Sequence, residues 1–146
     1  MGMMLVVLIY LIILGIQDYR EGSVSVMWLA AGAGILAGLG INRCIQGELL
    51  WMEVLLGIIP GAFLLAIAGL SGKAGYADGV VLIELGVCLG YREIMLLFGF
   101  SLLLLSMVSV LLLFLRKVRR NTKLPYLPFL AIVFILRQLC MESVLC

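Results

Sequence analysis

Long apolar stretches separated by short polar clusters make up almost the whole chain. A helix needs about 20 predominantly apolar residues to cross the hydrocarbon core of a bilayer, and the pattern supplies such stretches repeatedly. The polar clusters are too short for a separate soluble domain, so residues 1–146 are predicted to form one all-α, membrane-embedded bundle. We expect six transmembrane helices, at about residues 1–17, 26–41, 49–70, 78–91, 94–115 and 125–146.

Two of these spans carry residues that bear on packing. The second span is rich in glycine and alanine, and small residues let helices approach closely in lipid, so we expect this helix to be central and packed on several sides. The third span contains Pro60-Gly61, which predicts a kink.

Composition supports the membrane assignment and excludes several classes of site. The chain of 146 residues is 65% hydrophobic and 12% charged, too few charges to cover a soluble domain of this size. Without a histidine, the chain has no His-based metal site and no Ser-His catalysis. The four cysteines form no Cys-x-x-Cys pair, and we expect them to be small packing residues. No metal, cofactor or nucleic-acid partner is expected.

The distribution of basic residues predicts the orientation. In a six-span chain, the loops after the first, third and fifth spans share one side and carry seven basic residues, whereas the other face carries only Arg43 and Arg92. The positive-inside rule therefore places the basic face in the cytoplasm and both termini outside. The run at 116–123 is also expected to contact anionic lipid. The seven residues are Arg20, Lys73, Arg116, Lys117, Arg119, Arg120 and Lys123.

Two carboxylates fall at matched depth on the cytoplasmic side, Asp18 at the end of the first span and Asp78 at the start of the fourth. If the two come within hydrogen-bonding distance they share a proton, so that one activates a water as general base while the other protonates or polarises the scissile carbonyl. Gly75 and Gly79 would let the backbone approach the site closely. The alternative is that Asp18 only ends a helix and Asp78 is an N-cap. Position alone leaves both possibilities open.

The residues around the two aspartates resemble motifs of the type IV prepilin peptidases. Residues 75–78 read Gly-Tyr-Ala-Asp and are followed by Leu85-Gly86 and Leu89-Gly90, similar to the family's G-x-G-D turn with its two downstream Leu-Gly pairs. Residues 16–20 with Val24-Ser25 are similar to the family's other aspartate motif. Residues 124–130 are similar to the proline-containing start of its last helix.

The resemblance implies a membrane aspartic endopeptidase of the G-x-G-D class. Such an enzyme cleaves the basic leader from prepilins or pseudopilins of type IV pilus-like systems at the cytoplasmic face of the bacterial inner membrane. Asp18 and Asp78 match the two catalytic aspartates, and Gly75, Ala77 and Gly79 match the supporting turn. The implied partners are a prepilin-like protein substrate and membrane lipid. Because no paired-cysteine segment precedes the first span, a peptidase-only form without N-methylation is expected.

Three positions depart from the family pattern. Ala77 stands where a second glycine is usual, Val80 where a lysine commonly follows the aspartate, and Ser25 where proline is usual. None of them removes a carboxylate. They leave open reduced activity or a non-catalytic small membrane protein, either an assembly factor on an inactive peptidase scaffold or a channel or transporter subunit.

Three other carboxylates and one arginine receive lesser assignments. Glu21, beside Asp18, is the candidate to meet the positive charge of a leader. Glu84 is expected to pack against another helix rather than to act in catalysis. Arg137 and Glu142 are expected to snorkel or to pair with each other for structural reasons.

Overall fold

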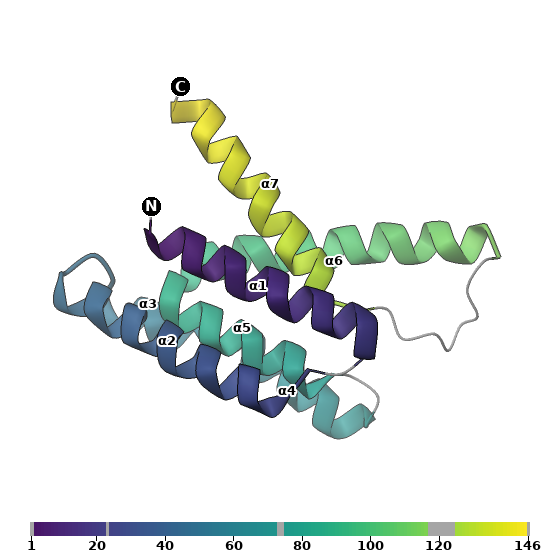
Figure 1. The fold of residues 1–146 in the computed structure, drawn as a ribbon, viewed down its shortest axis with the longest axis horizontal. Coiled ribbons are helices and arrows are strands. Elements are labelled where there is room, and N and C mark those ends of the chain that lie inside the picture. The colour runs from purple at the N-terminus through teal and green to yellow at the C-terminus, as the bar shows by residue number, and fades with distance from the viewer. Residues whose placement is uncertain (1, 23, 73–74, 117–124, 146) are drawn as a thin grey trace.

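The computed structural model describes residues 2–22, 24–72, 75–116 and 125–145. Within these ranges every regular element is a helix, and Figure 1 shows how the helices are arranged. The elements are α1 (Gly2–Glu21), α2 (Val26–Ile45), α3 (Trp51–Gly57), α4 (Ile59–Ser71), α5 (Tyr76–Leu89), α6 (Tyr91–Phe114) and α7 (Leu127–Leu145).

The expected helical membrane bundle is confirmed. Five helices are long and apolar enough to cross a membrane, with α3 and α4 counted together as Trp51–Ser71. The remaining predicted span, α5, has 14 residues and is shorter than a bilayer-crossing helix needs to be. The expected kink lies at Ile58, which ends α3 and caps α4. Pro60 follows in the first turn of α4, where a missing N–H leaves no helical bond unmade.

The central helix is α5 rather than α2, which corrects the expectation from the glycine-rich second span. Most of α5 is buried, and glycines bring its neighbours onto its backbone. A Cβ on Gly61 of α4 would lie 2.6 Å from the backbone nitrogen of Ile83, and one on Gly40 of α2 would lie 2.5 Å from the carbonyl oxygen of Val87. By contrast, Gly34 and Gly38 of α2 have no atom within 4 Å of a built Cβ. Half of the small-residue surface of α2 is therefore open.

The end of α1 packs against the start of α7. A Cβ on Gly15 would lie 3.4 Å from the Cα of Pro128, and Leu11 and Leu14 of α1 share the buried core with Leu130 of α7. Figure 1 shows that α1 ends and α5 begins at the same end of the molecule, while the two termini lie toward the opposite end. This arrangement brings three distant chain segments together at one end.

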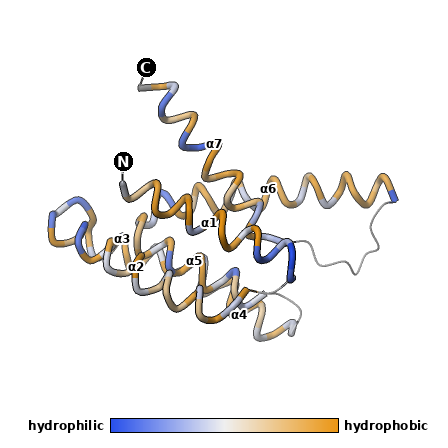
Figure 2. The backbone as a smooth tube through the Cα atoms, in the orientation of Figure 1, coloured by the Kyte–Doolittle hydropathy of each residue, from blue (hydrophilic) through white to orange (hydrophobic). Residues whose placement is uncertain are grey.

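The second half of α6 and the second half of α7 leave the bundle in different directions (Figure 1). The outer half of α6 is apolar along its length (Figure 2), and Leu103, Met107 and Phe114 are exposed. A helix that is apolar all round belongs in lipid or in a protein interior. An ion pair between Arg137 of α7 and Glu93 of α6 joins the two helices where they diverge.

Two expectations about charge need comment. The predicted pairing of Arg137 with Glu142 is wrong, because Arg137 pairs with Glu93. The topology signal rests largely on residues 117–123 and Lys73, which lie outside the described residues. The orientation of the bundle in the membrane therefore remains a prediction.

Candidate active site

Asp18 lies in the last turn of α1, on the helix face that points into the bundle. Val7, Leu11 and Leu14 on that face are completely buried, and Asp18 continues the same row at the next helical interval. One carboxylate oxygen of Asp18, Oδ2, is buried without a hydrogen-bond partner. The backbone N–H of Leu127, the first residue of α7, lies against the carboxyl group. Asp18 is therefore turned inward and held at the junction of α1 and α7.

Asp78 lies in the first turn of α5. The N-cap of this helix is Gly75, in an extended conformation, so the alternative that Asp78 is the N-cap is wrong. A Cβ on Gly75 would lie 2.9 Å from Asp78 Oδ2, so only glycine leaves the carboxylate its present space. A negative charge is also favourable near a helix N-terminus. Asp78 is thus the acidic residue in the first turn of α5.

The three departures from the family pattern leave this local geometry intact. Ala77 is the second residue of α5 and is not among the residues with positive φ, so its position does not require glycine. Ser25 is the N-cap of α2 with φ −64° and ψ 130°, the backbone conformation that proline would also adopt. Val80 is half-buried within α5.

Asp18 and Asp78 come together at one end of the bundle. Asp18 is in the last turn of α1 and Asp78 in the first turn of α5, and α1 ends where α5 begins (Figure 1). Among the described residues, no group of three His, Cys, Asp or Glu side chains lies close enough to hold a metal ion. The site is therefore a carboxylate pair contributed by two helices.

Tyr126, just before α7, is a third side chain at this site, and the sequence analysis missed it. It is 6% exposed, and its hydroxyl lies 2.6 Å from Ser101 Oγ. Ser101 Oγ also lies 2.9 Å from the Phe98 carbonyl oxygen, to which it can donate. Burial raises the pKa of Tyr126 to about 12, with the Ser101 hydrogen bond opposing the rise and the charge of Asp78 adding to it. Tyr126 is therefore a neutral hydroxyl beside the carboxylates.

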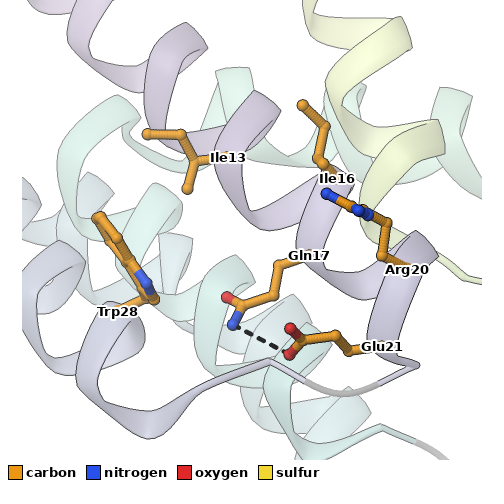
Figure 3. A pocket seen from close by; sticks show the side chains of 6 residues that line it. All are labelled: Ile13, Ile16, Gln17, Arg20, Glu21 and Trp28. Atoms are coloured by element: carbon orange, nitrogen blue, oxygen red, sulfur yellow. Dashed lines mark hydrogen bonds between the residues drawn. The ribbon is translucent and has the colours of Figure 1, made fainter.

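A cavity of about 530 Å³ lies between the last turns of α1 and the start of α2, and neither Asp18 nor Asp78 is among its lining residues. Figure 3 shows its lining. Gln17 Nε2 donates to Glu21 Oε2 at 3.4 Å, and the oxygen Oε1 of Gln17 is buried without a partner. The cavity is large enough for water and has polar groups to bind it. The lining residues are Ile13, Ile16, Gln17, Arg20, Glu21 and Trp28.

Glu84 is packed inside the bundle, as expected, and is not part of the carboxylate pair. It is 6% exposed, and the hydroxyl of Tyr10 on α1 donates to its Oε2 at 2.5 Å. Gly32 of α2 leaves room for the Tyr10 ring, because a Cβ there would overlap the end of that ring. The bond therefore fixes α1 relative to α5, the two helices that carry Asp18 and Asp78.

Comparison with known proteins adds no relative to this picture. No family model, no curated protein and no solved structure matches the chain. The function must therefore be inferred from the residues of the site and their geometry.

Proposed function

We propose that this chain is a membrane aspartic endopeptidase that removes the basic leader from prepilin- or pseudopilin-like precursors at the cytoplasmic side of a bacterial inner membrane. One observation carries the proposal. Asp18 and Asp78 come from different helices, and both lie at the end of the bundle where α1 ends and α5 begins.

The chemistry is hydrolysis by two carboxyl groups that hold one proton. Two carboxyl groups that come within hydrogen-bonding distance do not both ionise readily, so one stays protonated. The ionised carboxylate removes a proton from water, whose oxygen attacks the scissile carbonyl carbon, while the protonated carboxyl donates to the carbonyl oxygen. When the C–N bond breaks, the proton taken from water passes to the leaving nitrogen, and a hydroxyl of the tetrahedral intermediate returns a proton to the other carboxylate as the carbonyl re-forms. Both groups are then restored to their starting state.

The charges around the site favour a precursor with a basic leader. Glu21 is exposed and lies three residues from Asp18, so the two side chains are neighbours on the helix surface. Its carboxylate can receive a lysine or arginine of the leader. The apolar segment of the precursor would then continue into the bilayer, the solvent that the exposed apolar surface of this bundle requires.

The test is a processing assay. The protein is expressed together with a candidate precursor that has a short basic leader, a glycine and a long apolar helix, and leader loss is followed by gel shift. We expect Asp18→Asn and Asp78→Asn each to lower processing by about 100-fold or more, since each removes a proton-transfer group. Glu142→Gln is the matched control, because Glu142 is an exposed carboxylate on α7.

Two other outcomes would contradict the proposal. If both asparagine variants process the precursor as well as the parent protein, the mechanism is wrong. If the parent protein processes no precursor and the asparagine variants lose folding or ion flux instead, the chain is a non-catalytic membrane protein.

A further inference from the structure

Among the side chains that the structure describes, one hydrogen bond joins α1 to α5, from the Tyr10 hydroxyl to Glu84 Oε2 at 2.5 Å. α1 packs mainly on α7, whereas α5 packs mainly on α4 and α2, so the backbones of α1 and α5 have little contact with each other. The position of Asp18 relative to Asp78 therefore depends on the side chains that cross the space between these two helices.

Most of the side chains in this space are apolar and set the register of the helices only loosely. Leu11 and Leu14 of α1 and Val81 and Leu85 of α5 belong to one buried core. The attraction between apolar surfaces is non-directional, so it resists a small slide of one helix along the other less than a directional bond does. A hydrogen bond restricts both a distance and an angle, and the Tyr10–Glu84 bond therefore selects one axial position of α1 on α5.

The surroundings of the Tyr10–Glu84 bond make it costly to break. Glu84 is 6% exposed, and its second oxygen, Oε1, is buried without a partner. The Tyr10 ring fills the space beside Gly32 of α2, where a Cβ would overlap the end of the ring. With so little exposure, water does not replace a lost partner, and removing one group leaves the other buried and unpaired.

The bond also lies at nearly the same distance from both carboxylates. α1 runs toward the end of the bundle that carries them, and α5 runs away from it (Figure 1). Asp18 follows Tyr10 by about 12 Å along α1, and Asp78 precedes Glu84 by about 9 Å along α5. Pairing Tyr10 with Glu84 thus brings Asp18 and Asp78 to within about 3 Å of the same level along the bundle.

We propose that Tyr10 and Glu84 are positioning residues, whose hydrogen bond holds α1 and α5 in the register that sets Asp18 level with Asp78. This inference rests on the proposed function and gives a role to a buried carboxyl group that the hydrolysis itself does not use. A slide of α1 by one residue moves Asp18 by about 1.5 Å, and a misplacement of about 1 Å can cost about 100-fold in rate. Because the bond lies a few helical turns from the carboxylates, its loss should affect the chemical step more than the binding of the precursor.

The kinetics of leader removal, measured with purified protein and precursor in detergent, test this role. Tyr10→Phe removes the hydroxyl alone, Glu84→Met removes the acceptor, and Glu84→Gln keeps an oxygen that can accept the bond. We expect Tyr10→Phe and Glu84→Met to lower kcat by about tenfold or more and to change KM by less than about twofold, whereas Glu84→Gln should retain most of kcat. The double variant Tyr10→Phe, Glu84→Met should be no slower than either single variant, because both changes remove the same bond.

Tyr91→Phe is the matched control, since Tyr91 follows the end of α5 whereas Asp78 lies at its start. A parental kcat in both Tyr10→Phe and Glu84→Met would overturn the positioning role, as would a Glu84→Gln protein as slow as Glu84→Met. All variants are assayed on the monodisperse fraction from size-exclusion chromatography. If Tyr10→Phe is not recovered folded, the comparison of Glu84→Met with Glu84→Gln decides.

Cross-linking measures the register without any activity. Asp18→Cys and Asp78→Cys are combined in a chain whose four native cysteines are replaced by alanine, and a short bifunctional thiol reagent is added. A protease site inserted at Gly47, between α2 and α3, reveals the bridge as joined fragments on a gel. We expect the bridge to form in this background, to decrease severalfold when Tyr10→Phe is added, and to persist with Glu84→Gln.

The cross-linking outcomes separate this inference from the proposed function. Equal bridging with and without Tyr10→Phe would overturn the positioning role even if the parent protein cuts the precursor. A parent protein that bridges as expected but cuts no precursor would overturn the proposed function and leave the register role of the bond in place. No bridge in any background would overturn both, because positions 18 and 78 would then not be neighbours.

Discussion

At the residue scale, Asp78 is preceded by two small residues, Gly75 and Ala77, which have different roles. Gly75 caps α5 without a side chain, and the Asp78 carboxylate occupies the space that a Cβ would take. Ala77 has helical surroundings and no need of positive φ. Positions 75 and 77, which match the two glycines of the G-x-G-D turn, are therefore not equivalent in this chain, because only position 75 requires glycine.

Gly75→Ala is expected to lower leader removal by about tenfold to a hundredfold, because a displaced catalytic group loses its alignment with the substrate. The bundle itself should remain folded, since Gly75 is exposed at the helix end. The measurement combines the gel-shift assay with size-exclusion chromatography in detergent. Gly69→Ala is the control, as a Cβ there meets nothing within 4 Å. Equal losses of leader removal in Gly75→Ala and Gly69→Ala would show that the space beside Gly75 does not determine the position of the Asp78 carboxylate.

Ala77→Gly restores the residue that is usual in the resembling family, yet we expect no gain in processing. Alanine already supports the first turn of α5, and glycine in a helix costs up to about 1 kcal/mol relative to alanine. Thermal unfolding followed by circular dichroism should show a slightly less stable protein. A large rise in processing would contradict this expectation, because it would mean that alanine at position 77 impairs the turn before Asp78.

At the element scale, the bundle is organised by close backbone contact around α5. The carbonyl of Gly57 on α3 lies where a Cβ of Gly86 would be, and the carbonyl of Gly86 likewise faces Gly57. Both atoms that would have to move are backbone atoms, so neither helix can adjust by a side-chain rotation. This crossing fixes α5 and, through it, Asp78.

Gly86→Ala should therefore destabilise the protein strongly, by about 2–4 kcal/mol. Its matched control is Gly99→Ala on α6, where a Cβ meets nothing within 4 Å and the change should stay within about 0.5 kcal/mol. Thermal unfolding of the purified proteins in the same detergent measures both. A Gly86→Ala protein as stable as the control would mean that α3 and α5 do not cross at this point.

Most helices could be predicted from the sequence, but not which helices pack against one another. Runs of apolar residues mark each helix to within a few residues because burial in lipid demands length and apolarity together. Glycine content could not identify the central helix, since a glycine on an open face such as Gly34 looks the same in sequence as one at a crossing such as Gly86. Tyr126 was missed because its contact with Ser101 joins segments whose proximity depends on the packing of α6 and α7.

At the scale of the whole molecule, the end of α1 that carries Asp18 is hydrophilic, as is the segment between α2 and α3, and the helices between these ends are largely apolar (Figure 2). α7 starts beside Asp18 and runs away from it, so the described C-terminal end lies at the other end of the bundle, as the N-terminus does (Figure 1). The six crossings expected from the sequence would also return the chain to its starting side. Asp18 and Asp78 should then face the compartment opposite to both termini.

Reporter fusions can test this orientation directly. The positive-inside rule places the loop after α6, with its basic run at 116–123, in the cytoplasm. Green fluorescent protein should therefore fluoresce when it is fused after Leu115 and stay dark when it is fused to the C-terminus, and alkaline phosphatase should show the reverse activities. The two fusion sites serve as controls for each other because they flank one crossing, α7. Fluorescence from the C-terminal fusion would place the carboxylates outside the cell, where no leader that stays in the cytoplasm could reach them.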